Sequence, residues 1–328
     1  MRSHKLNLTF WFFSLCVGYF VLLTNQAYAQ NYPNRPIHWI VPWPPGGGAD
    51  VVARMVSSPV AESLGQPILI ENKPGAGGNI GAQYAVHALP DGYSIVFAYS
   101  GTHSINRHIY KDMPFEESDF VPIIFLTSVP QLLVINPKLP VTSVKELIAY
   151  AKDNPGKLTF GSSGNGAINH LAGQLFSSMA GIKLLHVPYK GGAPAAAAVF
   201  SGEVDILFGE PSTVLQFVNT GKLRALATSS DRRSVSLPDI PTIAEAGVPG
   251  YAVTSWNGLL APKGTPESII TRLNKEFNKV LADKDMQARL IKIGYEPIGG
   301  PAENFSKHIA AETLKWGPII RESGLKLN

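Results

Sequence analysis

Three glycine-rich segments hold the residues best suited to bind an anion in this 328-residue chain. Each follows a predicted strand and leads into a predicted helix, whose first backbone N–H groups have no partner within the helix and can meet a negative charge. In the first segment, residues 42–50, three prolines stiffen the chain, and Gly46, Gly47 and Gly48 let it approach a ligand closely. A tight turn with Asp50 as the helix cap explains the same residues equally well.

The other two glycine-rich segments, residues 72–79 and 161–166, bring hydroxyl and amide groups to predicted helix starts. Because the three segments follow strands in two different α/β units, they predict a ligand held in an interdomain cleft at the carboxyl ends of strands. Together with the residue that follows the strand predicted at 94–99, the second and third segments supply the candidate binding residues Gly77, Asn79, Ser100, Ser162, Ser163, Gly164 and Asn165.

Two basic side chains near these segments have two interpretations each. His170 lies one helical turn beyond the third segment, where it either meets a ligand or hydrogen-bonds to the loop. Lys190 either contacts an anionic ligand or lies in a solvated turn. The five-residue spacing of His103 and His108 does not suit a metal pair on a helix. We therefore expect no metal and no other cofactor.

Catalytic motifs are incomplete. The hydrolase elbow Gly-x-Ser-x-Gly fails at residues 161–165, because its fifth position is Asn165. The glycines of residues 75–81 are spaced one residue too far apart for a dinucleotide fingerprint, and no Gly-Lys-Ser/Thr phosphate loop occurs. A binding protein without enzymatic activity is the preferred interpretation, and a secreted serine hydrolase with Ser162 or Ser163 as nucleophile is the alternative.

The N-terminal residues predict export. Arg2 and Lys5 precede an apolar stretch over residues 6–23, and Ala27-Tyr28-Ala29 matches a cleavage site, so residues 1–29 are interpreted as a signal peptide and the mature chain as periplasmic. An uncleaved membrane anchor is the alternative. Cleavage removes the single cysteine, which excludes disulfides, and leaves 26 Lys and Arg against 24 Asp and Glu. This small excess gives no support for a nucleic-acid partner.

The mature chain alternates short β-branched or aromatic runs with helical patterns, which predicts an α/β fold. A first strand is expected at residues 37–43. Long apolar runs at 120–135 and 252–260 separate two α/β units and are interpreted as strands that cross between two lobes. We expect a monomer with lobe one at residues 30–129 plus 256–328 and lobe two at residues 130–255.

Over essentially the whole mature chain, the sequence resembles the tripartite tricarboxylate transporter substrate-binding proteins, also called the Bug family of periplasmic receptors. The resemblance implies a type II periplasmic-binding-protein fold, with two α/β lobes joined by crossing hinge strands and closing on a small carboxylate. It also implies delivery of that ligand to the membrane subunits of a tripartite transporter. The motifs that carry it are IVPWPPGGGAD (40–50), ENKPGAGGNIG (71–81), PDGY (90–93), GSSGNG (161–166), HLAG (170–173), VPYKGGAP (187–194) and LLAP (259–262).

The family's binding residues carry over to both lobes. In the family, backbone groups and ordered waters of the first glycine loop hold the carboxylate, and side chains of the other lobe vary with the ligand. Three residues depart from the family pattern, and one of them, Pro59, is expected to kink the first long helix. Trp43 stands where phenylalanine is common, and Glu210 puts a carboxylate where a bound dianion would be repelled. The class of carboxylate is therefore open between di- or tricarboxylates, acidic amino acids and aromatic acids. The carried-over positions are Trp43, Gly46, Gly47, Gly48, Asp50, Ser162, Ser163, Gly164 and Asn165.

Overall fold

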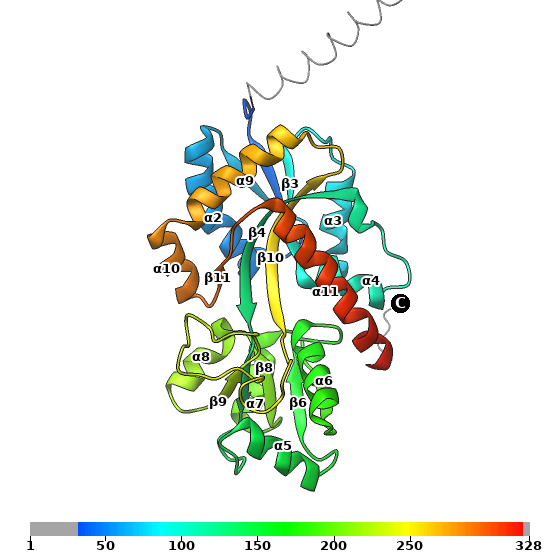
Figure 1. Cartoon of the computed structure of the whole chain (residues 1–328), viewed down its shortest axis with the longest axis vertical. Coiled ribbons are helices and arrows are strands. Elements are labelled where there is room, and N and C mark those ends of the chain that lie inside the picture. Colours follow the sequence, from blue (N-terminus) through cyan, green and yellow to red (C-terminus); the bar gives the residue numbers. More distant parts are fainter. Residues whose placement is uncertain (1–31, 324–328) are drawn as a thin grey trace, which may run out of the picture.

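The computed structural model describes residues 32–323, so the predicted signal peptide lies outside the described residues. Two α/β lobes lie one beyond the other along the long axis of the molecule (Figure 1). Strands β4 (Phe120–Pro130) and β10 (Thr254–Pro262) form an antiparallel pair that runs from the first lobe toward the second. These two strands correspond to the apolar runs that the sequence assigned to lobe crossings.

The first lobe, uppermost in Figure 1, contains a six-stranded sheet in the order β11-β4-β10-β3-β1-β2. Besides β4 and β10, its elements are β1 (Ile37–Val41), β2 (Ile68–Asn72), β3 (Ser94–Tyr99), β11 (Glu296–Pro297), α2 (Gly48–Leu64), α3 (Asn79–Val86), α4 (Asn106–Ile109), α9 (Glu267–Leu281), α10 (Lys284–Lys292) and α11 (Ala302–Ser323). β1 pairs in parallel with β2 and β3. It ends two residues before the predicted boundary, because Pro42 has no N–H to donate to the ladder.

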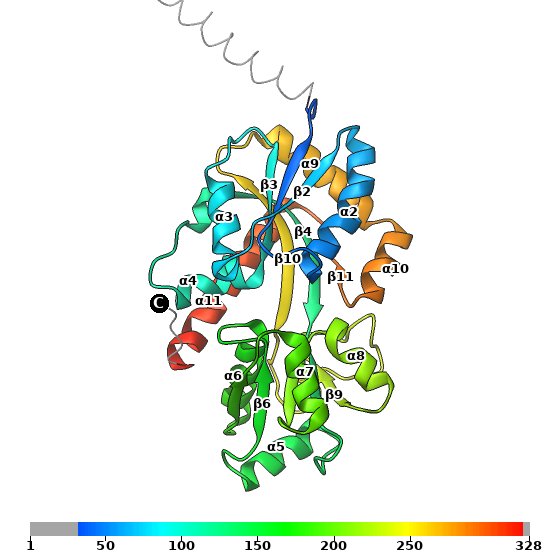
Figure 2. The ribbon, with the colours of Figure 1, turned by 180° about the vertical axis from the view of Figure 1, so that it is seen from behind.

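The second lobe contains a five-stranded sheet in the order β7-β6-β8-β5-β9. Its elements are β5 (Leu132–Ile135), β6 (Thr159–Ser162), β7 (Leu185–Pro188), β8 (Ile206–Gly209), β9 (Arg224–Thr228), α5 (Val144–Asp153), α6 (Ile168–Ala180), α7 (Gly192–Ser201) and α8 (Pro211–Asn219). β6 is parallel to both β7 and β8, so the loops that follow these strands emerge at one edge of the sheet. That edge faces the first lobe (Figures 1 and 2).

The long apolar run predicted at 120–135 is two strands in two sheets. β4 belongs to the first sheet and β5 to the second. Between them, the backbone N–H of Gln131 donates to Ser229 Oγ at 2.7 Å, a contact with the second lobe. The predicted lobe boundaries at residues 129 and 255 fall close to the two crossings, and they remain our proposal.

Helix α11 contacts both lobes. Near its start, Phe305 is buried against Trp256 of β10, with ring centroids 5.5 Å apart. Farther along, Trp316 joins the buried cluster of the second lobe together with Ile105 and Ile109 from the first. Figure 1 shows the end of this helix beside α6. The lobes are therefore connected by apolar packing as well as by the crossing strands.

Candidate functional site

A cavity of about 350 Å³ lies between the two lobes. The loops after β6 and β8 line it from the second lobe, and the ends of β1 and β3 with the segments near α3 and α4 line it from the first. Its lining residues are Trp43, Gly77, Tyr99, Gly101, Asn106, Ile109, Tyr110, Ser163, Gly164, Asn165, Gly166, Ala167, Ile168, Asn169 and Glu210.

Two aromatic rings form an apolar wall in the first lobe. Trp43 meets Tyr99 edge to face, with centroids 5.0 Å apart and planes at 68°. Gly78 makes room for this arrangement. Its φ of +94° favours glycine, and a Cβ at this position would lie 3.2 Å from the Trp43 ring. This wall offers an apolar surface to the carbon skeleton of a ligand.

Asp50 lies beneath the first glycine loop and connects it to its surroundings. Its carboxylate, 5% exposed, accepts hydrogen bonds from Gly46 N (2.9 Å), Arg54 Nε (2.9 Å) and Asn72 Nδ2 (3.0 Å). The bond to the Arg54 side chain, with those from Gly46 and Asn72, lowers the Asp50 pKa to about 2 against the opposing effect of burial. Asn72 Nδ2 also donates to the carbonyl of Trp43 at 2.9 Å. Asp50 is therefore a positioning residue for the aromatic wall.

A second group of amides positions Asn106 in the cavity. Asn106 Nδ2 donates to the carbonyl of Gly77 at 3.1 Å and to Asn79 Oδ1 at 2.7 Å. Thr102 Oγ1 donates to the same Gly77 carbonyl at 2.9 Å. Asn79 itself is buried, and its role is to hold the Asn106 amide group in place.

The wall in the second lobe is a loop that hydrogen bonds hold in one conformation. Asn169 Oδ1 accepts from Ser163 N at 3.0 Å, and Asn169 Nδ2 donates to Ser163 Oγ at 2.8 Å. Gly166 N donates to His170 Nδ1 at 3.1 Å. The His170 ring stacks on His186 with centroids 3.7 Å apart, and burial followed by the neighbouring His186 lowers the His170 pKa to about 4. His170 thus supports the loop as a neutral side chain.

The loop presents the start of α6 to the cavity. No side chain caps this helix, whose N-cap residue is Ala167. By contrast, Ser143 caps α5, at the far end of the second lobe, by accepting from Glu146 N at 3.2 Å. The first N–H groups of an α-helix have no partner within the helix and carry its positive partial charge. The start of α6 is therefore suited to receive a carboxylate.

Glu210 is the one charged side chain among the described residues that line the cavity. It is the N-cap residue of α8 and forms no ion pair with the residues that the structure describes. Burial raises its pKa. Tyr99 and Tyr295 from the first lobe lie close enough that its charge adds to the effect of burial in raising their pKa values.

Six of the fifteen predicted binding residues line the cavity: Trp43, Gly77, Ser163, Gly164, Asn165 and Glu210. Asp50, Asn79 and His170 lie behind the lining and position its residues. Gly48 makes room for the hydroxyl of Tyr295. The predicted residues outside the lining are Gly46, Gly47, Gly48, Asp50, Asn79, Ser100, Ser162, His170 and Lys190.

The sequence analysis missed four polar lining residues, Tyr99, Asn106, Tyr110 and Asn169. Tyr99 ends a predicted strand next to Ser100, so its position at a strand end was a usable signal. Asn106 follows a π-helical turn that gave no motif. Asn169 lies in the first turn of the helix after the third glycine-rich segment, where a side chain can return to the loop.

One observation favours the hydrolase alternative: a serine and a histidine lie within hydrogen-bond distance of each other. Ser162 Oγ lies 2.6 Å from His186 Nε2. However, Ser162 is fully buried, lies outside the cavity lining, and is also bonded to Gly164. Among the described residues no carboxylate hydrogen-bonds to His186, so nothing orients this base for catalysis. The Ser163 hydroxyl is occupied by Asn169 and meets no histidine within residues 32–323.

Residues 52–325 match the protein family described as the tripartite tricarboxylate transporter family receptor. The chain belongs to this family. It is 36% identical to Protein BugT of Bordetella pertussis over 316 residues, which cover 95% of this chain and 97% of BugT.

Solved structures of the same family have the same fold. The R. palustris protein Rpa4515 with adipate is 36% identical, with a TM-score of 0.79 over 90% of this chain and 99% of that protein. MatC from Rhodopseudomonas palustris with bound malate is 30% identical, with a TM-score of 0.74 over 88% of this chain and 100% of MatC. The predicted family and the type II periplasmic-binding-protein fold are confirmed, and the family is one of receptors rather than enzymes. No helix within residues 32–323 is long and apolar enough to span a membrane.

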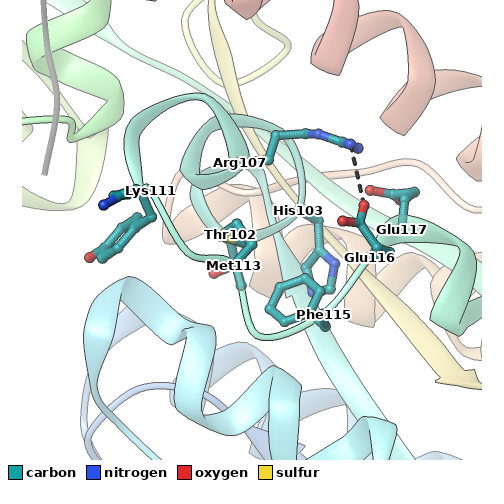
Figure 3. A pocket seen from close by; sticks show the side chains of 9 residues that line it. Thr102, His103, Arg107, Lys111, Met113, Phe115, Glu116 and Glu117 are labelled. Atoms are coloured by element: carbon teal, nitrogen blue, oxygen red, sulfur yellow. Dashed lines mark hydrogen bonds and ion pairs between the residues drawn. The ribbon is translucent and has the colours of Figure 1, made fainter. Parts of the chain in front are cut away.

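The receptor has a second, smaller hollow of about 200 Å³, lined by residues of the segment that connects β3 to β4. Figure 3 shows Arg107 reaching toward Glu116, with which it pairs at 3.5 Å, and His103 beside Phe115. Burial lowers the pKa of His103 to about 3, so the ring is neutral at pH 7. None of the predicted binding residues lines this hollow.

Glu117, which lines this hollow, is expected to make the stability of the receptor depend on pH. Burial raises the pKa of Glu117 to about 7, partly offset by Arg107. Between pH 4.5 and 7 the folded protein keeps a proton that the unfolded chain has lost, so the free energy of unfolding falls as pH rises. We expect the change in the free energy of unfolding caused by Glu117→Gln to be more favourable at pH 8 than at pH 5, by on the order of 1 kcal/mol. Denaturant unfolding at both pH values measures this, with exposed Glu62→Gln as control. Parallel pH profiles for wild type and Glu117→Gln would contradict it.

Proposed function

We propose that the protein is an exported periplasmic receptor that binds a small carboxylate between its lobes and delivers it to the membrane subunits of a tripartite tricarboxylate-type transporter. The family supports the receptor role. The N-terminal sequence supports export of the protein. Its membership of the family supports delivery of the ligand to a transporter.

The observation that carries the carboxylate proposal is the uncapped start of α6 in the cavity. Apart from Glu210, the described lining is neutral, and it includes no lysine, arginine or histidine. An anion bound there is held by the helix N-terminus, which contributes about 0.3–1 kcal/mol and up to about 2 kcal/mol when partly buried. Each neutral hydrogen bond adds about 0.5–1.5 kcal/mol. Several such contacts hold a carboxylate without a cationic side chain.

The opposite wall supports the rest of the ligand. We propose that Trp43 and Tyr99 contact its carbon skeleton while Ser163, Gly164 and Asn165 surround the carboxylate. The first glycine loop then acts through Asp50, which holds the wall in place. Adipate and malate, present in the two related structures, are the first compounds to test.

The test is titration calorimetry of the mature protein, residues 30–328, with adipate, malate, succinate, aspartate, citrate and benzoate. We expect saturable binding of at least one acid. The diamide of the best acid should bind at least about tenfold more weakly, because it lacks the charge that the start of α6 receives. If no acid binds, or if acid and diamide bind equally, the proposed function is wrong.

A further inference from the structure

The cavity contains an unpaired acid beside the site proposed for the ligand carboxylate. Glu210 ends the loop after β8, and Ser163 to Ala167 follow β6. β6 and β8 are neighbouring parallel strands, so these two loops begin side by side. A Cβ on Gly192 would lie 3.5 Å from Ser163 Oγ and 3.4 Å from the Thr213 side chain of α8, which places the two loops in proximity.

The Glu210 carboxyl group has no partner among the residues that the structure describes. Within residues 32–323 its carboxyl oxygens accept no hydrogen bond, and the basic residues that form ion pairs do so with other acids. The nearby phenols belong to Tyr99, which bonds to Ser255 at 3.2 Å, and to Tyr295, which packs against Gly48. Glu210 is half-buried in the wall of the cavity, so a ligand bound there can donate a hydrogen bond to a carboxyl group that no described protein group occupies.

We infer that Glu210 selects carboxylates that carry a hydroxyl or ammonium group near the bound carboxylate, in preference to the unsubstituted diacid. The ligand carboxylate meets the start of α6, and its hydroxyl or ammonium group donates to the Glu210 carboxyl group. A second free carboxylate at the same place meets an acid of its own sign. Burial raises the Glu210 pKa, as expected of an acid that lacks a partner in the unliganded protein.

This inference rests on the proposed function, and one matched series of ligands tests it. Succinate, malate and aspartate share a four-carbon diacid skeleton and differ in carrying hydrogen, hydroxyl or ammonium at one carbon. Titration calorimetry at pH 7.5 compares wild type with Glu210→Gln, which keeps an acceptor without the charge, and with Glu210→Leu, which removes both. Glu203→Gln is the matched control, because Glu203 lies in the second lobe outside the cavity lining.

In wild type, malate and aspartate should bind at least about tenfold more tightly than succinate, since charged hydrogen bonds are the stronger kind. Glu210→Gln should reduce the preference for aspartate about tenfold and largely keep the preference for malate. Glu210→Leu should abolish both preferences without weakening succinate. Thermal unfolding without ligand checks that each variant is folded.

Three results overturn the inference. If succinate or adipate binds as tightly as malate and aspartate, or if the ratios are the same in all variants, Glu210 does not select the ligand, although the protein is still a carboxylate receptor. If none of the acids binds to wild type, both the inference and the proposed function fail.

Discussion

Gly294→Ala is expected to weaken carboxylate binding roughly 10- to 100-fold while the protein stays folded. Gly294 lies in the first lobe just before β11, and a Cβ there would lie 2.7 Å from Cβ of Pro211 at the start of α8 in the second lobe. The added methyl group pushes the lobes apart at this contact. Overpacking costs about 1–3 kcal/mol, and 1.4 kcal/mol is tenfold in affinity. Titration calorimetry with the best acid measures the loss.

The control separates lobe contact from backbone strain. Gly294 has φ +83°, so alanine is also strained there. Gly264 has φ +89°, but a Cβ at that position would lie 3.7 Å or more from its neighbours, which belong to Pro90 of the same lobe. We expect Gly264→Ala to lose similar stability with unchanged affinity. Equal affinities of the two variants would show that the Gly294 contact plays no part in closure.

Asp50→Ala is expected to lower the free energy of unfolding by about 2–3 kcal/mol, because hydrogen bonds to buried charged groups contribute about 1.5–3 kcal/mol. The variant leaves Gly46 N and Arg54 without their carboxylate partner and frees Asn72 from one of its contacts. Ligand binding should weaken too, because Asn72 holds the carbonyl of Trp43. Denaturant unfolding and calorimetry measure the two effects.

An exposed pair with the same spacing is the control for Asp50. Glu303 pairs with Lys307 four residues later, as Asp50 does with Arg54, but both side chains are about 70% exposed. Glu303→Ala should cost no more than about 0.5 kcal/mol. The Asp50 contribution is fully present above pH 3.8 and is lost as pH falls through about 2. Similar losses for the two variants at pH 7 would contradict the role of Asp50.

Some parts of the site were predictable because they depend on local sequence. Glycines after strands identified the loop at Ser163 and Gly164, and the φ of +132° at Gly164 is one that glycine adopts readily. The same argument predicted that Gly46 to Gly48 bind a ligand. In the structure, Gly48 instead leaves room for the hydroxyl group of Tyr295. A glycine signals close approach, and the sequence does not say what approaches.

Other parts depend on contacts between distant segments. Asn106 becomes a lining residue only because Gly77 and Asn79, almost thirty positions earlier, orient its amide group. The run at 120–135 was predicted as one element, although Pro130-Gln131 marks the point where the chain passes from the first sheet to the second. The strands on either side carry the same apolar residues, because both faces of each sheet are covered. The unpaired state of Glu210 also depends on which residues the fold places around it, and composition gives no sign of that.

A crystal structure of the mature protein with its best carboxylate tests the central claim most directly. We predict that one ligand carboxylate lies about 3 Å from backbone N–H groups at the start of α6, with its carbon skeleton against Trp43 and Tyr99 and Glu210 beside it. A carboxylate bound instead on Gly46 to Gly48 alone, or in the hollow beside His103, would contradict the account.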